Sequence, residues 1–191
     1  MIPGVEGTRL NGLPTSPPIL VETSFMDVAV EMRQSVTGQQ EVWAHVETLP
    51  AFEIALLGHN PKGELTLILM EKRRLATDEP KVKVPGGYLV PGRSMQQKIL
   101  ADTGISINEN GLIGTGHVIG HSEIKTPITL YYLPPEGWEK TNEPREGVRV
   151  FAATLENAAK MAMGHEVEND SSFSLIMRLY WLWRERLLLC D

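Results

Sequence analysis

Hydrophobic and polar residues alternate in four segments of the first half of the chain, and this pattern predicts paired strands. Residues 25–34 and 41–49 alternate on either side of the turn sequence TGQQ, so they are expected to form a hairpin. Residues 52–58 and 64–74 form a second pair, because HNPKG between them supplies the Asn, Pro and Gly of a tight turn. The sequence therefore predicts two successive β-hairpins.

The second half of the chain combines further strands with three helices. A helix is predicted over residues 94–103, with Gly104 as its stop. The other predicted elements are strands at residues 111–122, 126–135 and 147–155, a short helix at 155–165 and a long helix at 166–189. Asp170, Ser171 or Ser172 is expected to cap the last helix. Together these elements predict an α+β fold, an α/β/α sandwich with a mixed sheet.

Length and composition indicate one main domain. The chain has 191 residues, of which 42% are hydrophobic, and this is enough for a single domain with a sizeable core. Residues 1–24 are expected to be a flexible or extended lead-in, because residues 1–18 are rich in proline and glycine and lack apolar periodicity. Residues 25–191 are expected to form the domain, with residues 25–48 as an N-terminal hairpin extension.

Charge and apolar patterning argue against several classes of partner. The formal net charge is −6, so no overall positive field would attract nucleic acid. Arg178, Arg184, Glu185 and Arg186 interrupt the apolar C-terminal segment before about 18 apolar residues accumulate, so no membrane span is predicted. The N-terminus lacks a signal-peptide pattern, and the only cysteine, Cys190, cannot form an internal disulfide. We therefore expect a cytoplasmic protein.

Residues 85–104, PGGYLVPGRSMQQKILADTG, contain the clearest chemical signal. Gly86, Gly87 and Gly92 lie in a loop that enters the first predicted helix. Backbone amides in such a loop, together with a helix N-terminus, suit a phosphate or diphosphate group. Glycine-rich turns are also common structural devices, so the loop alone does not establish a site.

The order of motifs in this stretch resembles the Nudix box, whose signature is G-x5-E-x7-R-E-U-x-E-E-x-G-U, with U an aliphatic residue. In that family the glutamates hold Mg²⁺ or Mn²⁺ against a nucleoside diphosphate linked to another group. Residues 25–185 look most like the ADP-ribose pyrophosphatase branch, in which an N-terminal hairpin helps to form a homodimer and part of the adenosine site. The resemblance implies a small nucleoside-diphosphate ligand, a homodimer, and a ligand contact from Arg74 in MEKRR.

The match to the box preserves its glycines and loses its acids. Gly87 takes the opening position, but Arg93, Lys98 and Ala101 stand where three glutamates belong, and only Asp102 remains acidic. The helix is also four residues shorter than the pattern, which is about one turn. Positive side chains in place of carboxylates repel a divalent cation. No cofactor is therefore expected unless the protein is a hydrolase, in which case Mg²⁺ or Mn²⁺ is required.

Two further groups of residues are candidates for roles in this site. Arg93 and Lys98 could contact a diphosphate directly, or they could form ordinary surface pairs. Glu143 and Glu146 lie in a loop that, in the family, often supplies the glutamate that orients the attacking water; a solvated acidic loop is the other interpretation.

Three functional hypotheses follow. The first is a catalytically impaired Nudix-fold protein that binds a nucleoside-diphosphate-linked ligand through Arg74, Gly86, Gly87, Gly92 and Lys98. The second is an active hydrolase with a noncanonical metal site that uses Asp102, Glu143 and Glu146. The third is a dimeric scaffold without a ligand. Dependence on a divalent metal separates the first two, because hydrolysis requires the metal and binding alone does not.

Overall fold

The computed structural model describes residues 19–22, 26–34, 37–73, 79–119, 127–167 and 170–188. The chain divides into two compact units. The N-terminal unit comprises residues 1–49 and 121–126, and the main unit comprises residues 50–120 and 127–191. The predicted site residues belong to the main unit.

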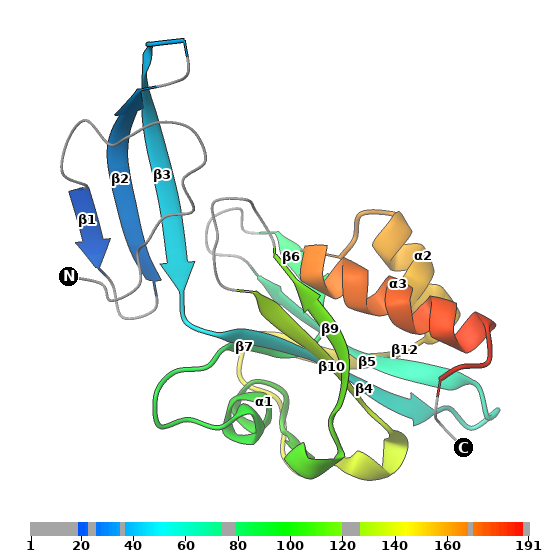
Figure 1. The fold of residues 1–191 in the computed structure, drawn as a ribbon. Coiled ribbons are helices and arrows are strands. Elements are labelled where there is room, and N and C mark those ends of the chain that lie inside the picture. The colour runs from blue at the N-terminus through cyan, green and yellow to red at the C-terminus, as the bar shows by residue number, and fades with distance from the viewer. Residues whose placement is uncertain are drawn as a thin grey trace. The chain divides into compact units, whose positions relative to one another are not determined.

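The N-terminal unit contains a three-stranded antiparallel sheet in the order β1–β2–β3 (Figure 1). Its strands are β1 (Ile19–Glu22), β2 (Met26–Gln34) and β3 (Gln40–Thr48). The register of β2 and β3 runs from Met26 opposite Thr48 to Gln34 opposite Gln40, so the hairpin predicted from alternation is confirmed. Strand β1 lies within residues 1–24, the segment for which the sequence predicts a flexible or extended lead-in.

The main unit is built on a seven-stranded mixed sheet. Its strands are β4 (Ala51–His59), β5 (Leu65–Arg73), β6 (Pro80–Lys83), β7 (Gly86–Tyr88), β9 (Ile113–Val118), β10 (Ile128–Leu133) and β12 (Val148–Thr154). The main order is β12-β5-β4-β10-β9, with β6 beside β5 and β7 beside β4. Strands β4 and β10 are parallel, and the other pairs are antiparallel. Strand β4 changes partner along its length, from β7 at Ala51 to β5 at His59.

A second sheet has two strands, and both lie between the first and second helices in the sequence. It pairs β8 (Ile105–Ile107) with β11 (Trp138–Lys140). Two short 3₁₀ helices, Glu109–Gly111 and Pro135–Gly137, flank this part of the chain. Neither β8 nor β11 was predicted, because three residues are too few to show a period.

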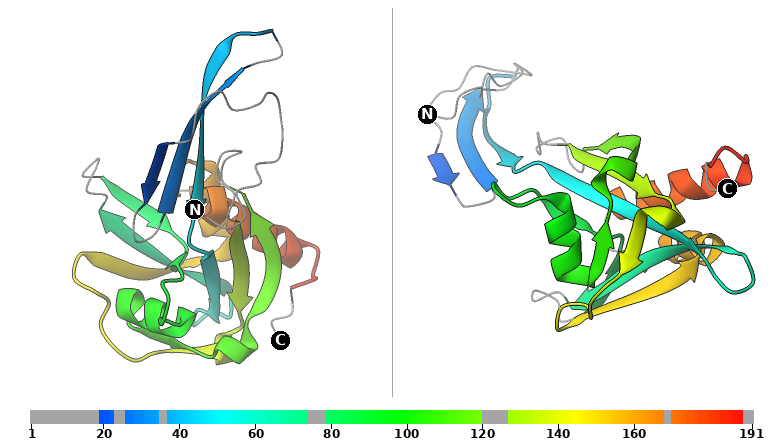
Figure 2. Two further views of the ribbon diagram at one scale, coloured as in Figure 1. Left: turned by 60° about the vertical axis from the view of Figure 1, so that its left-hand side comes forward. Right: turned by 90° about the horizontal axis from the view of Figure 1, so that it is seen from below.

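Three helices cover the two faces of the large sheet. Helices α2 (Leu155–Met163) and α3 (Asp170–Arg184) lie on one face, and α1 (Met95–Thr103) lies on the other (Figures 1 and 2). The α+β fold and its α/β/α layering are therefore confirmed. The predicted cap of the last helix is wrong, because the helix already begins at Asp170 and the two serines lie within its first turn.

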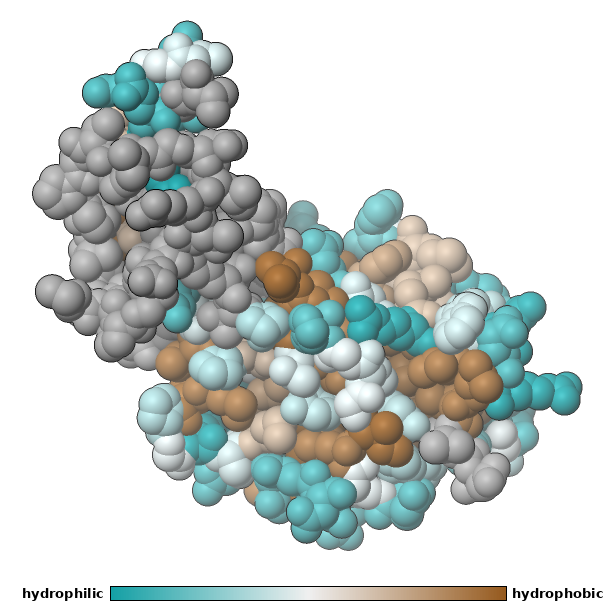
Figure 3. All heavy atoms as spheres, viewed as in Figure 1, coloured by the Kyte–Doolittle hydropathy of each residue, from teal (hydrophilic) through white to brown (hydrophobic). Residues whose placement is uncertain are grey.

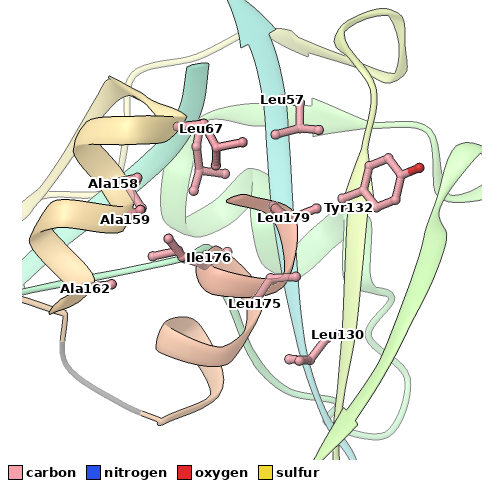
Figure 4. Packing of buried hydrophobic residues seen from close by; sticks show 14 of the residues in the cluster. Leu57, Leu67, Leu130, Tyr132, Ala158, Ala159, Ala162, Leu175, Ile176 and Leu179 are labelled. Atoms are coloured by element: carbon pink, nitrogen blue, oxygen red, sulfur yellow. The ribbon is translucent and has the colours of Figure 1, made fainter. Parts of the chain in front are cut away.

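The larger hydrophobic core lies between the sheet and helices α2 and α3. Helix α2 contributes three buried alanines, which allow it to approach the sheet closely. Helix α3 contributes Leu175, Ile176 and Leu179, which pack in one cluster with Leu57, Leu67 and Leu130 of the sheet (Figure 4). A smaller core on the opposite face holds α1 through Ile99 and also contains Phe52, Ile54, Leu56, Ile68, Ile105, Ile107 and Leu133.

Among the residues that the structure describes, one carboxylate is buried. Glu53 of β4 is 3% exposed and accepts hydrogen bonds from Ser171 (3.0 Å) and Ser172 (2.9 Å) in the first turn of α3. The Ser172 hydroxyl also accepts a hydrogen bond from the backbone N–H of Val84 (3.1 Å). A negative charge at a helix N-terminus is electrostatically favourable. This network therefore connects β4, the start of α3 and the segment that leads into the glycine loop.

Arg178 of α3 covers the outer edge of β9. Its guanidinium donates to the carbonyl oxygens of Thr115 (2.8 Å) and His117 (3.5 Å). Gly116 between them has φ of 119°, a backbone conformation that residues with a side chain rarely adopt, so this position favours glycine. The edge strand at the opposite end of the sheet is β12, which pairs only with β5 among the strands that the structure describes.

On the visible surface of the main unit, hydrophilic residues are interspersed with smaller hydrophobic areas (Figure 3). Within the described ranges, no helix has the length and apolar character needed to cross a bilayer.

Candidate functional site

The glycine loop is held by close backbone packing. Gly86 pairs with Glu53 on β4, and a side chain at Gly86 would collide with the carbonyl oxygen of Phe52. Gly87 faces helix α1, since a Cβ built there lies 3.0 Å from Cε of Lys98. Gly92 has a left-handed φ of 79°, which glycine adopts without strain, in the turn that precedes the helix. The prediction that all three glycines lie in a loop is wrong for Gly86 and Gly87, which belong to strand β7, whereas Gly92 lies in the turn before helix α1.

Helix α1 begins with a complete capping box and ends with a left-handed glycine. The Ser94 side chain accepts a hydrogen bond from the N–H of Gln97, and the Gln97 side chain accepts one from the N–H of Ser94. Gly104 has φ of 71° and ends the helix, as the sequence predicted. No acidic residue lies in the first turn.

The central feature of α1 is an ion pair between Lys98 and Asp102. The Lys98 ammonium donates to Oδ2 of Asp102 one turn later on the same helix face. The two side chains are 23% and 16% exposed, so the pair is partly shielded from water. The predicted metal residue and a predicted anion contact therefore bind each other. Arg93 is exposed, and its guanidinium lies 3.5 Å from the carbonyl oxygen of Gln97.

The loop that carries the predicted catalytic glutamates is fixed to the end of α1. The backbone N–H groups of Thr141 and Asn142 donate to Gly104 O (3.0 and 2.9 Å), and that of Arg145 donates to Asp102 O (3.3 Å). A side chain on Gly104 would collide with the backbone of Asn142. The structure therefore places this loop beside helix α1.

In the described part of the chain, the carboxylates of this loop form no ion pair with helix α1. The Glu143 side chain is 87% exposed and pairs with Lys140 at 3.3 Å. Glu146 is exposed and has no polar partner among the described residues. Arg74 lies outside the described residues, because β5 ends at Arg73 and the description resumes at residue 79.

Sequence reasoning missed three lysines on the sheet face that carries α1. Lys72 lies opposite Lys81, and Lys83 lies opposite Met70. Opposed residues share a face, and Ile68, two residues before Met70 on β5, packs with α1. We call Lys72, Lys81 and Lys83 the lysine row. The alternation in KVKV, with both valines buried, was the signal that could have revealed it.

In the part of the chain that the structure describes, two cations of the lysine row have no carboxylate partner. Lys81 pairs with Glu79 at 3.1 Å. In the described part of the chain, neither Lys72 nor Lys83 forms an ion pair within 4 Å. Lys72 is exposed and Lys83 is half-buried. This face therefore offers positive charge to an anion.

The donor set of the site does not fit a divalent metal. Mg²⁺ and Mn²⁺ require several oxygen ligands, and carboxylates usually supply them. At the box positions Asp102 is the one carboxylate, and the ammonium of Lys98 occupies it. Over the described ranges, His, Cys, Asp and Glu side chains nowhere gather in a group of three or more that could hold a metal ion.

A cavity of about 510 Å³ lies beside the glutamate loop. Its walls come from β12, from β8 and β11, and from the loop; the residues that line it are Ile68, Thr103, Ile105, Trp138, Lys140, Glu143, Pro144 and Val148 through Ala152. The Trp138 indole N–H donates to Leu57 O at 2.6 Å, which fixes that wall. Of the predicted site residues that the structure describes, only Glu143 lines this cavity.

Two other cavities contain none of the predicted site residues. One of about 280 Å³ lies between the β4–β5 turn, the start of α2 and Trp183. Its wall includes Glu156, whose pKa is lowered from the ordinary value by the hydrogen bond and charge of Lys160. The other, of about 470 Å³, lies at the ends of β5, β6 and β12.

The mixed sheet with its three helices has a fold that a known structure shares. It matches a solved structure described as the crystal structure of an ADP compounds hydrolase, with a TM-score of 0.62 and 12% sequence identity. The match covers 91% of this chain and 98% of that chain. No family model and no curated protein matches the sequence. At this level of identity, the likeness concerns the fold.

Proposed function

We propose that this protein binds a nucleoside-diphosphate derivative without a divalent metal and does not hydrolyse it efficiently. The ion pair between Lys98 and Asp102 is the observation that carries the proposal, because it places an ammonium on the carboxylate that a metal would need. Fold likeness to an ADP compounds hydrolase supports the choice of ligand class, which remains part of the proposal.

The anion is expected to bind on the α1 side of the sheet. After its bond to Asp102, the Lys98 ammonium still has two N–H donors, and the Lys98 side chain packs against Gly87. Lys72 and Lys83 add positive charge on the same sheet face. Charge-assisted hydrogen bonds from ammonium groups to phosphate oxygens replace the bridging role that metals have in the family.

Isothermal titration of ADP-ribose tests this proposal. The protein is titrated once in Mg²⁺ and once in EDTA, and product formation is followed on the same samples. We expect equal affinity in both conditions and no release of AMP. Metal-dependent turnover would overturn the proposal in favour of a hydrolase that uses Asp102, Glu143 and Glu146, and an absence of binding in both conditions would favour a scaffold.

Lys98→Gln is the variant that tests the central contact. It removes the charge and keeps a similar side-chain length. We expect ADP-ribose affinity in EDTA to fall about threefold to tenfold, the range for loss of one ordinary, partly solvated hydrogen bond. Lys62→Gln, in the exposed β4–β5 turn, removes the same charge outside the site and is expected to bind like the parent protein. Equal affinity in both variants would contradict the role of Lys98.

A further inference from the structure

We infer that the 510 Å³ cavity between β12 and the β8–β11 sheet receives a planar, uncharged heterocyclic group, the nucleobase end of the ligand. This inference rests on the proposed function. It assigns the base to the main unit itself, whereas the sequence resemblance places part of the adenosine site at the N-terminal hairpin. The cavity volume lies within the usual range of about 300–1,000 Å³ for small-molecule sites.

The side walls of the cavity are apolar and rigid. Ile68, Val150 and Ala152 lie on the sheet face that carries α1, because Ile68 is opposite Ala152 and packs in the same cluster as Val150. Ile105 and Trp138 form the facing wall from β8 and β11. Trp138 cannot turn away, since its N–H is bonded to Leu57 O. Such walls favour a flat apolar ring over a charged group.

The backbone of β12 supplies polar groups to the same cavity. Arg149 and Phe151 point to the opposite face of the sheet, where Arg149 pairs with Glu71 and Phe151 packs on the larger core. Both nevertheless line the cavity, so their main chain must reach it. Strand β12 has no second strand partner among the described elements. Its outward N–H and C=O groups can therefore bond to a ring that both donates and accepts.

The charged side chains at the rim of the cavity, one lysine and one glutamate, neutralise each other. Lys140 and Glu143 lie at the mouth and pair with each other at 3.3 Å. Within the described residues, Lys72 and Lys83 of the lysine row have no carboxylate partner. This division matches an amphipathic ligand, with its neutral ring in the cavity and its phosphates on the lysine row. Thr103 and Glu143 connect the two regions, because the glutamate loop is bonded to the end of α1.

A substitution that fills the cavity tests the binding of the ring separately from the binding of the phosphates. Ala152 is exposed on the edge strand, and phenylalanine is favoured in strands, so Ala152→Phe can occupy the mouth without disturbing the core. Met163→Phe adds the same ring at an exposed position at the end of α2 and serves as the control. Both full-length variants are titrated in EDTA with ADP-ribose and with inorganic pyrophosphate, and their melting temperatures are compared with that of the parent protein.

We expect Ala152→Phe to weaken ADP-ribose binding by about tenfold or more and to leave pyrophosphate binding unchanged, while Met163→Phe changes neither. Undiminished ADP-ribose binding in Ala152→Phe would overturn the inference and leave the proposed function intact. Equal loss of both ligands would also overturn it, since the cavity would then not distinguish ring from phosphate. If the parent protein binds neither ligand in EDTA, the proposed function and the inference both fail.

Discussion

Lys98 and Asp102 form an ion pair across one turn of α1, with the Lys98 side chain packed against Gly87. The pair holds the last carboxylate of the box positions next to the glycine loop. Because the ammonium already satisfies this carboxylate, a cation from solution must displace it before it can bind.

Lys98→Glu should create a metal response that the parent protein lacks. The substitution places a second carboxylate one turn from Asp102, and two nearby carboxylates attract a divalent cation. We expect millimolar Mn²⁺ to raise the melting temperature of this variant by about 2 °C relative to EDTA. Lys98→Gln is the control and should not respond. Stabilisation of the parent protein by Mn²⁺ would contradict the interpretation of the ion pair.

Gly104→Ala should destabilise the main unit strongly. Gly104 combines a left-handed φ of 71° with a Cβ position that collides with the backbone of Asn142. We expect a loss of about 2–4 kcal/mol in the free energy of unfolding, measured by urea denaturation. Gly63→Ala is a matched control with φ of 77° and open space around its Cβ, so it should cost about 1 kcal/mol. Similar losses in both would mean that the loop contact contributes little.

Ser172→Ala should cost more stability than Ser174→Ala. Ser172 binds the buried carboxylate of Glu53 and accepts the N–H of Val84, so its removal leaves buried polar groups short of a partner. We expect a loss of about 2–3 kcal/mol. Ser174 lies on the same helix, is half-buried and should tolerate the change within about 0.5 kcal/mol. Thermal melts of the two variants make the comparison, and equal melting temperatures would count against the network.

Lys83→Ala and Lys72→Ala should each weaken ADP-ribose binding in EDTA by about twofold to fivefold. This is the effect of losing one partly solvated charge contact. Lys62→Ala, in the exposed turn, should leave the affinity unchanged. Titrations at two salt concentrations add a second test, because loss of a lysine that contacts phosphate makes binding less sensitive to salt. A salt dependence equal to that of Lys62→Ala would remove these lysines from the site.

The parts of the fold that depend on local signals could be predicted from the sequence. Helix α1 was predicted because Ser94 and Gly104 are strong local start and stop signals. The hairpins were predicted from alternation and turn residues. The ion pair of Lys98 with Asp102 could also have been anticipated, since residues four apart share a helix face.

Features that depend on contacts between residues far apart in the sequence could not be predicted from local patterns. The lysine row requires the register between β5 and β6, which no local pattern fixes. Glu53 lies inside an apolar strand, and its partners come from a helix more than 100 residues later in the chain. The cavity forms between elements from three separate segments. The homodimer through residues 25–48, the cytoplasmic location and the role of Arg74 stay predictions.

The bond between Arg178 and β9 has a consequence for association. With the carbonyl oxygens of Thr115 and His117 occupied, another chain cannot easily add a strand to that end of the sheet. In the described part of the main unit, β12 is the other end of the main strand order, and its outer edge has no strand partner. Edge-to-edge growth through this sheet would therefore stop at two molecules and would not continue into a fibre.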